Sequence, residues 1–193
     1  MIRRNAIQTL LVAGTLPAAL VLQAQNTQLD VATLLRRGGC ALMLRHAQTV
    51  AGIGDPPEFK LDQCNTQRNL NDEGRDQAKR IGQWFASRNL RAASVQSSAW
   101  CRCKDTAELA FGRFGVLPAL NSTFDDRAPQ AAQTDALRKR LKSIAVGQFE
   151  VWVTHQVNVA AMTNEFLSMG EAFVVKLGSS TAPASVLGRT TFG

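Results

Sequence analysis

An arginine and a histidine stand side by side at Arg45 and His46, directly after a short apolar run. A guanidinium group offers a rigid fork of N–H donors to a tetrahedral oxyanion, and a neutral imidazole can serve as a nucleophile or a general base. The apolar run, residues 41–44, follows Gly38 and Gly39 and is typical of a buried strand in a parallel sheet. Because open α/β folds bind ligands at the carboxyl ends of their strands, the sequence predicts that Arg45 and His46 face a ligand.

A second histidine and a second arginine occupy similar positions later in the chain. His155 follows the mostly apolar segment 149–154, which we predict to be another strand, and Arg102 lies between a predicted strand at 92–96 and a predicted helix at 104–111. Taken alone, Arg102 would be an exposed charge and His155 a capped imidazole with its hydrogen bonds satisfied. However, the chain contains only two histidines and each ends an apolar run, which favours one shared anion-binding site.

Three segments of the chain, residues 44–49, 97–107 and 151–155, carry these groups in order. They resemble the histidine phosphatase (phosphoglycerate mutase-like) superfamily, with its arginine-histidine-glycine signature, its serine-rich strand end leading to an arginine, and its second strand-ending histidine. Residues 70–78 resemble a further family segment, and Ala47 stands where the family has glycine. The resemblance implies a three-layer α/β sandwich with a mostly parallel central sheet flanked by helices. The alternation of predicted strands and helices indicates the same fold class independently.

The resemblance also implies a role for each group. His46 would attack phosphorus and become a phosphohistidine, Arg45 and Arg102 would clamp the phosphoryl oxygens, and His155 would complete the cradle. The expected activity is that of a phosphomonoesterase without a metal or other cofactor, acting on a phosphorylated small molecule or a phosphoprotein. The alternative is a non-catalytic protein that binds phosphate or another anion in the same pocket.

The acid that protonates the leaving group is less clearly marked in the sequence. Many family members take it from a carboxylate after the second segment, which here indicates Asp125, with Asp126 as the next choice. Both aspartates could instead form an Asx turn or a helix cap. Other branches place an aspartate directly after the second histidine, where this chain has Gln156. The hydroxyl of Thr49 could contact phosphate or cap the following loop.

Size and charge restrict the remaining possibilities. With 193 residues, of which 45% are hydrophobic, the chain can bury one domain but not two. Its formal net charge of +7 favours acidic ligands. Nucleic acid is not an expected partner, because the basic residues are scattered, aromatic residues make up 6% of the chain and tyrosine is absent.

The N-terminal residues predict export. Arg3 and Arg4 precede an apolar stretch at 7–22 that ends in small and polar residues, which is typical of a secretory signal peptide. We therefore expect a signal peptide at 1–24, a histidine phosphatase domain at 25–193, and a periplasmic or secreted location. Pro17 interrupts the short apolar stretch, which argues against a stable membrane span, although an uncleaved anchor is the alternative.

All four cysteines lie in the predicted mature part, where an oxidising compartment favours at least one disulfide. Four cysteines allow three full pairings, and their spacing matches no zinc site. We expect Cys64 to pair with Cys101, because Cys64 ends a long loop that leaves the first histidine and Cys101 precedes the second arginine at the same edge. Cys103 would then point away from Cys101, and Cys40 would be a buried thiol in the first strand.

Overall fold

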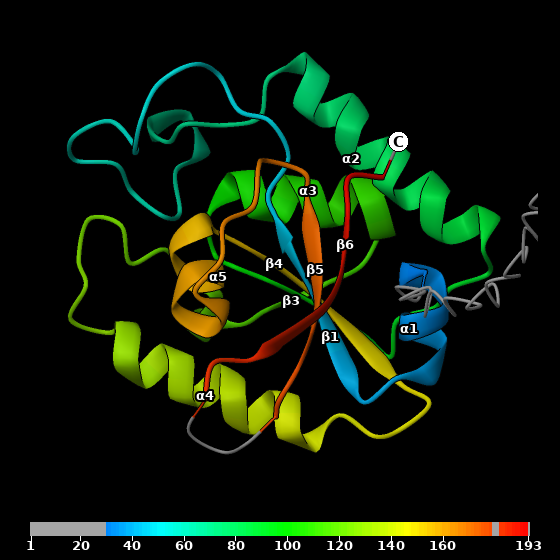
Figure 1. Cartoon of the computed structure of the whole chain (residues 1–193). Coiled ribbons are helices and arrows are strands. Elements are labelled where there is room, and N and C mark those ends of the chain that lie inside the picture. Colours follow the sequence, from blue (N-terminus) through cyan, green and yellow to red (C-terminus); the bar gives the residue numbers. More distant parts are fainter. Residues whose placement is uncertain (1–29, 179–181, 193) are drawn as a thin grey trace, which may run out of the picture.

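A mixed six-stranded sheet lies at the centre of the structure, a computed structural model that describes residues 30–178 and 182–192 (Figure 1). Its strands are β1 (Cys40–Arg45), β2 (Ser94–Ser97), β3 (Gly115–Val116), β4 (Phe149–Thr154), β5 (Ala172–Lys176) and β6 (Ser185–Thr190). They are arranged in the order β3-β2-β4-β1-β5-β6. β1, β2, β3 and β4 run parallel, whereas β5 is antiparallel to both of its neighbours. The predicted mostly parallel sheet is therefore confirmed.

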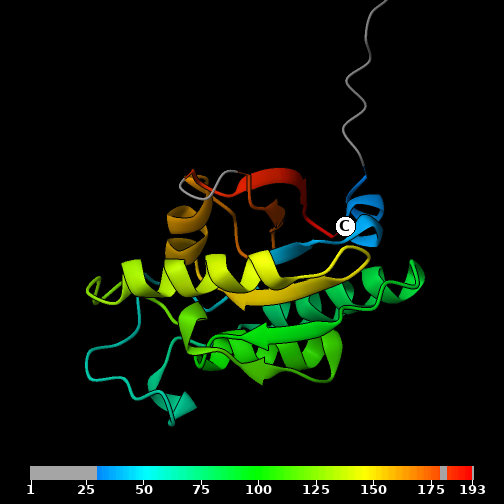
Figure 2. The same ribbon diagram turned by 90° about the horizontal axis from the view of Figure 1, so that it is seen from below.

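Helices cover both faces of this sheet (Figure 2). The α-helices are α1 (Val31–Arg37), α2 (Asp72–Ser87), α3 (Cys101–Phe111), α4 (Gln130–Ser143) and α5 (Gln156–Thr163), and two 3₁₀ turns are η1 (Cys64–Thr66) and η2 (Pro118–Leu120). Side chains of α1, α2 and α3 pack into one apolar cluster, and those of α4 and α5 into another on the opposite face. This arrangement is the three-layer sandwich expected from the sequence.

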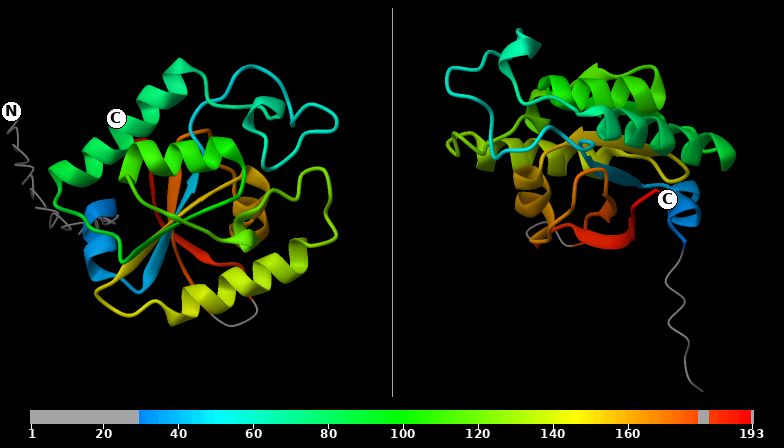
Figure 3. Two further views of the ribbon diagram at one scale, coloured as in Figure 1. Left: turned by 180° about the vertical axis from the view of Figure 1, so that it is seen from behind. Right: turned by 90° about the horizontal axis from the view of Figure 1, so that it is seen from above.

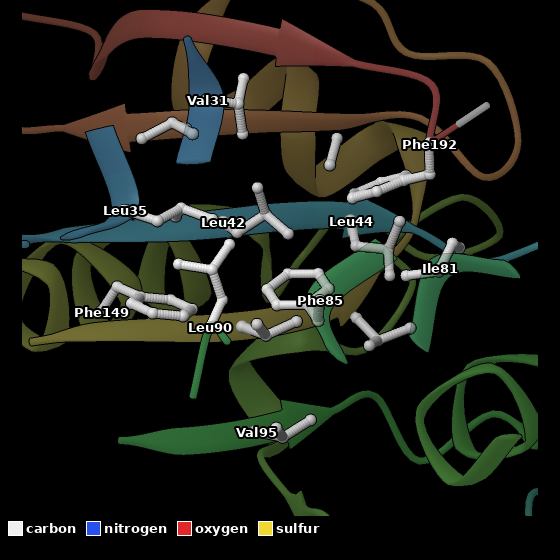
Figure 4. Packing of buried hydrophobic residues seen from close by; sticks show 14 of the residues in the cluster. Val31, Leu35, Leu42, Leu44, Ile81, Phe85, Leu90, Val95, Phe149 and Phe192 are labelled. Atoms are coloured by element: carbon white, nitrogen blue, oxygen red, sulfur yellow. The ribbon is translucent and has the colours of Figure 1, made fainter. Parts of the chain in front are cut away.

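The alternation of side chains along β1 explains why its sequence is apolar throughout. Leu42 and Leu44 point into the cluster beneath α1, α2 and α3, where they meet Phe85 of α2 (Figure 4). Ala41 and Met43 point the other way, into the cluster beneath α4 and α5. Because successive side chains of a strand face opposite sides, a central strand covered on both faces has no position left for a polar residue. The first polar side chains appear only where β1 ends.

The ends of several elements differ from the sequence prediction. α2 begins at Asp72, because the Oδ1 atom of Asn71 accepts a hydrogen bond of 2.8 Å from the backbone N–H of Gly74. In contrast, the mostly apolar sequence of residues 159–169 favours a helix that continues to Met169, whereas α5 begins at Gln156 and stops at Thr163. Asn164 adopts a left-handed backbone conformation with φ of 61° and ends the helix.

The predicted signal peptide at 1–24 lies outside the described residues. Within the described ranges, no helix has both the length and the apolar character that crossing a bilayer would require.

Candidate active site

The parallel pairing of β1 and β4 places the two histidines next to each other. In this pairing Arg45 lies opposite Thr154, so the residues that follow each strand leave the sheet at the same edge. The backbone N–H of His46 donates a hydrogen bond of 3.0 Å to the carbonyl oxygen of Thr154. The centroids of the His46 and His155 rings are 5.5 Å apart, with the rings in an edge-to-face arrangement.

His46 is held as a neutral imidazole with one defined tautomer. Its Nδ1 atom lies 2.9 Å from the carbonyl oxygen of Ala47, and because a carbonyl can only accept, Nδ1 carries the proton. Nε2 has no hydrogen-bond partner among the described residues and keeps its lone pair. Burial, followed by the positive charge of Arg102, lowers the pKa of His46 to about 3. The ring is therefore uncharged and nucleophilic at neutral pH.

His155 is also buried and neutral, but its Nε2 atom is already engaged. It lies 2.8 Å from the hydroxyl of Ser98 and 3.5 Å from the thiol of Cys103. Burial is the main cause that lowers the pKa of His155 well below its ordinary value, and the neighbouring His46 and Arg102 add to the effect. These contacts fix the orientation of the ring beside the first histidine.

Three arginines converge on the histidines, one more than the sequence analysis identified. Arg45 donates from Nη1 to the carbonyl oxygen of Leu167 at 2.8 Å, and Arg68 donates from Nη1 to Thr49 Oγ1 at 2.9 Å. The Nε–H groups of Arg45, Arg68 and Arg102 are buried, and none has a hydrogen-bond partner in the described part of the chain. Since buried donors are normally paired, three such donors at one place indicate an anion site.

Asp55 is the second residue that the sequence analysis missed. Its carboxylate accepts from Arg102 Nη1 at 2.7 Å and Nη2 at 3.1 Å, from Trp100 Nε1 at 3.0 Å, and from the backbone N–H of Arg68 at 2.9 Å. The Asp55 and Arg102 side chains are 2% and 5% exposed. Although burial alone would raise the pKa of Asp55, the hydrogen bonds from Arg102 and the other donors lower it below its ordinary value. Asp55 is therefore a carboxylate that fixes the Arg102 guanidinium.

These groups form the floor of a cavity of about 400 Å³. Its walls come from the loop after β1 and the loop before α4, which extend on the same side of the sheet in two opposite views (Figures 1 and 3). Five apolar residues also line it: Ile53, Phe124, Val157, Phe166 and Met169; the exposed side chains of Ile53, Phe124 and Phe166 lie at its mouth. The cavity thus combines a cationic floor with an apolar mouth.

Of the remaining predicted site residues, one lines this cavity and two do not. Asp125 lines it. Asp126 does not, because its Oδ1 atom accepts a hydrogen bond of 2.9 Å from the backbone N–H of Ala128, which is the Asx turn considered as the alternative. Thr49 does not line it either, because its hydroxyl is buried behind the Arg68 guanidinium. Thr49 therefore orients an arginine, and the structure gives it no direct contact with the anion site.

The backbone that follows His46 is packed closely on both sides. The N–H of Ala47 donates to Thr106 Oγ1 at 3.0 Å, and Ala47 does not adopt a positive φ, so alanine is accommodated without left-handed strain. On the other side, a Cβ atom at Gly74 would lie 1.8 Å from the carbonyl oxygen of Gln48. Only glycine permits α2 to approach this loop so closely.

A disulfide connects the loop after β1 to α3. Cys64 and Cys101 are bonded, with a Cα–Cα distance of 5.6 Å, which is the pairing expected from the sequence. Cys40 and Cys103 are buried free thiols. The bond fixes the loop that carries Asp55 next to the residue that precedes Arg102. In the described part of the chain, no group of three or more histidine, cysteine, aspartate or glutamate side chains could hold a metal ion.

The missed residues had weak sequence signals. Asp55 stands before Pro56 and Pro57 and Arg68 before an asparagine, positions that are typical of turns and solvated loops. The expected Cys64–Cys101 disulfide would hold residues near Cys64 in the sequence close to the sheet edge that carries Arg102. A search for charged residues near Cys64 would therefore have found Arg68.

Comparisons with known proteins agree with this geometry. Residues 41–133 match the model of the histidine phosphatase superfamily (branch 1). No curated protein matches the sequence. Among solved structures, the chain is similar to the protein histidine phosphatase SixA complexed with tungstate, at 16% identity and a TM-score of 0.55, covering 79% of this chain and 97% of that one.

Two further solved structures show the same fold. A putative phosphohistidine phosphatase SixA from Agrobacterium tumefaciens is 17% identical, with a TM-score of 0.51 and coverage of 78% of this chain and 97% of that one. A putative alpha-ribazole-5′-P phosphatase from Escherichia coli is 15% identical, with a TM-score of 0.54 and coverage of 76% and 95%. At these identities the likeness supports the fold, and the family match supports the activity. The family match over residues 41–133, together with this fold, supports assignment of the chain to the histidine phosphatase superfamily and a phosphatase activity.

Proposed function

We propose that this protein is a metal-independent phosphomonoesterase that works through a phosphohistidine on His46. The observation that carries the proposal is the neutral, buried His46 ring with a free Nε2, in the same cavity as three guanidinium groups with unpartnered Nε–H donors. A nucleophile and fixed donors for the phosphoryl oxygens are the main requirements of phosphoryl transfer.

The charge of the cavity floor matches a phosphomonoester. Arg45, Arg68 and Arg102 contribute three positive charges and Asp55 one negative charge, while both histidines are neutral, which leaves two positive charges. A phosphate monoester carries a charge of about −1.5 to −2 at pH 7. Arginines supply here the charge stabilisation that Mg²⁺ supplies in other phosphoryl-transfer enzymes, which is our reason for proposing metal independence.

The reaction proceeds in two displacements. The Nε2 lone pair of His46 forms a bond to phosphorus as the phosphorus–oxygen ester bond breaks, and the leaving oxygen takes a proton from Asp125. Water then attacks the phosphohistidine and gives a proton to the Asp125 carboxylate, the phosphorus–nitrogen bond breaks, and inorganic phosphate is released with Asp125 protonated again. Asp125 is assigned this role because it lines the cavity, whereas the other lining carboxylate, Asp55, is ion-paired with Arg102. His155 would hydrogen-bond the transferring group.

The similar structures support a tetrahedral oxyanion as ligand. SixA was solved with tungstate, and the E. coli protein is described as a putative phosphatase of a small phosphorylated molecule. We accordingly expect a phosphorylated small molecule or a phosphoprotein as substrate, and we expect tungstate to inhibit this protein competitively with a phosphomonoester.

The test is to trap the covalent intermediate. Purified protein mixed with ³²P-labelled substrate and quenched in alkali should carry an acid-labile label, which His46→Ala should lack. Val157→Ala is the control for a change of a neighbouring cavity residue outside the proposed chemistry. Label that persists in His46→Ala would contradict the nucleophile assignment, and phosphate binding without turnover would support the non-catalytic alternative.

Metal independence has a separate test. Turnover of para-nitrophenyl phosphate should survive prolonged dialysis against EDTA. A loss that added Mg²⁺ or Zn²⁺ restores would contradict the proposal, whatever the nucleophile.

We also propose that residues 1–24 are a signal peptide and that residues 25–193 act in the periplasm or outside the cell. The Cys64–Cys101 disulfide supports this, because such bonds persist in oxidising compartments. N-terminal sequencing of the protein from fractionated cells should show a new terminus near residue 25. An intact N-terminus in the cytosolic fraction would contradict export.

A further inference from the structure

Three strongly exposed apolar side chains gather around the mouth of the cavity. Ile53 is 90% exposed, Phe166 is 71% exposed and Phe124 is 52% exposed, and all three line the cavity. They come from three separate segments: the loop after β1, the loop before α4 and the segment after α5. Large apolar side chains scattered singly on a surface need no explanation, but three that border one cavity indicate a binding surface.

The backbone around these side chains is fixed. Ile53 lies between Gly52 and Gly54, which both have positive φ, and the carbonyl oxygen of Gly52 accepts a hydrogen bond of 2.8 Å from Arg68 Nη1. The ring of Phe124 packs against Gly54, where its Cε1 atom would lie 3.4 Å from a Cβ atom. The loop after β1 and the loop before α4 are therefore in contact at the mouth.

Phe166 is held by a different set of contacts. Its carbonyl oxygen accepts a hydrogen bond of 2.7 Å from Arg189 Nη2. The next residue, Leu167, donates its N–H to Gln156 Oε1 at 2.8 Å and gives its carbonyl oxygen to Arg45. The apolar mouth is thus tied to one of the arginines of the floor.

Two of the uncharged polar side chains near the mouth, Gln156 and Ser122, already take part in hydrogen bonds within the protein. The amide of Gln156 is used at both ends, because Nε2 donates to the carbonyl oxygen of Glu165 and Oε1 accepts from Leu167. The hydroxyl oxygen of Ser122 accepts from the N–H of Phe124 at 3.2 Å. Asp125 and Arg127 carry opposite charges, so the mouth has no net charge of either sign.

We infer that the substrates are phosphate monoesters of apolar, uncharged alcohols or phenols, whose leaving group lies against Ile53, Phe124 and Phe166. This inference rests on the proposed phosphomonoesterase function. A phosphate group of five heavy atoms, at the ~30 Å³ that water occupies in the liquid, takes roughly 150 Å³. More than half of the 400 Å³ cavity then remains for the leaving group. A sugar phosphate would bury some of its hydroxyls against Ile53, Phe124 and Phe166, which offer them no hydrogen-bond partner, and this is unfavourable.

The experiment uses the full chain and a series of 4-alkylphenyl phosphates, with methyl, propyl and pentyl substituents, below the concentrations at which they aggregate. Their leaving groups have nearly the same acidity, so the series reports contact with the mouth and leaves the leaving-group chemistry constant. We expect kcat/KM to rise about twofold to fourfold for each added methylene, because a fully buried methylene contributes a factor of roughly four. 4-(Hydroxymethyl)phenyl phosphate should be a poorer substrate than 4-ethylphenyl phosphate.

Two variants test the location of the contact. Ile53→Ser and Phe166→Ser should each lower the ratio of kcat/KM for the pentyl compound to that for the methyl compound by at least threefold. Val146→Ser is the matched control, because Val146 is 85% exposed but precedes β4 at the opposite edge of the sheet and does not line the cavity. It should keep the ratio.

The outcomes separate this inference from the proposed function. A flat or falling series, with the methyl compound still hydrolysed, would overturn the inference and leave the phosphomonoesterase function intact. A steep series that Ile53→Ser and Phe166→Ser leave unchanged would also overturn it. Failure to hydrolyse any member of the series, or para-nitrophenyl phosphate, would overturn both.

Discussion

Replacing Asp55 by asparagine tests how the arginines of the floor are held. The substitution keeps the size of the side chain but removes the charge that faces the buried Arg102 guanidinium, whose side chain is 5% exposed. Removing one partner of a buried ion pair costs about 3–5 kcal/mol. We expect a loss near 3 kcal/mol, at the lower end of this range, because the pair forms part of a cavity wall that water can reach. For a protein of this size the corresponding fall in Tm is roughly 6–12 °C.

The same substitution should change the response to phosphate. Without Asp55 the floor keeps three positive charges and one fewer negative charge, so inorganic phosphate should bind Asp55→Asn more tightly and raise its Tm more than that of the wild type. Turnover should fall, because Arg102 loses the bidentate contact that fixes its position. Asp62→Asn is the matched control, since it removes the same charge from an exposed position in the same loop.

The pH dependence of this effect has a defined sign. A carboxyl whose pKa is lower in the folded state stabilises the fold above its unfolded pKa of about 3.9 and loses this contribution as the pH falls through its folded value. The difference in unfolding free energy between wild type and Asp55→Asn should therefore be constant at pH 5–8 and shrink below pH 4. Denaturant titrations at several pH values measure it. A difference below 1 kcal/mol at pH 7, or a phosphate response equal to that of the wild type, would refute this account of the ion pair.

Three further predictions follow from the site and its supports. Because the pKa of His46 is lowered to about 3 and that of His155 well below its ordinary value, NMR of the chain's two histidines should show no titration between pH 8 and pH 5, and a midpoint near 6.5 would contradict this. Reducing the Cys64–Cys101 bond, which joins residues 37 positions apart, should cost roughly 4 kcal/mol and lower kcat/KM, whereas a variant with both cysteines changed to alanine should not respond to the reductant. Gly74→Ala should destabilise the protein by about 1–3 kcal/mol despite the higher helix propensity of alanine, and an equal or higher Tm would show that the close approach is not rigid.

The most reliable predictions from the sequence concern the buried strands and the residues that directly follow them. β4 has the bounds expected, 149–154, because most of its residues are buried and apolar and only Glu150 and Thr154 are polar. The positions of His46 and His155 follow from the same reasoning, since each is the first residue beyond such a strand. The end of α5 was not predicted, because a single left-handed residue, Asn164, interrupts a pattern that remains apolar beyond it.

The loops were predicted least well, and they supply two of the six charged or catalytic groups on the floor of the cavity. Asp55 and Arg68 lie in a segment without periodicity, and their positions depend on contacts that no local pattern encodes. These contacts are the disulfide at Cys64, the Arg68 bond to the hydroxyl of Thr49, and the Arg68 N–H bond to Asp55. Sequence reasoning offered Thr49 either as a phosphate contact or as a cap of the loop, because distance along the chain from His46 does not show that the Arg68 guanidinium donates to its hydroxyl.

Electrostatics could have indicated that something was missing. Bringing guanidinium groups into a largely buried site is costly unless a negative charge accompanies them, because burial and mutual repulsion both disfavour the charged forms; the lowered pKa values of Arg45 and Arg68 reflect this cost. If the floor held only arginines and neutral histidines, the guanidinium groups of the free protein would repel one another. Such a floor would also bind the phosphate product so tightly that its release would limit turnover. The clamp that the sequence predicted therefore requires a carboxylate nearby in the free protein. In this protein that carboxylate is Asp55, and its single charge is small enough to leave the floor attractive to a dianion.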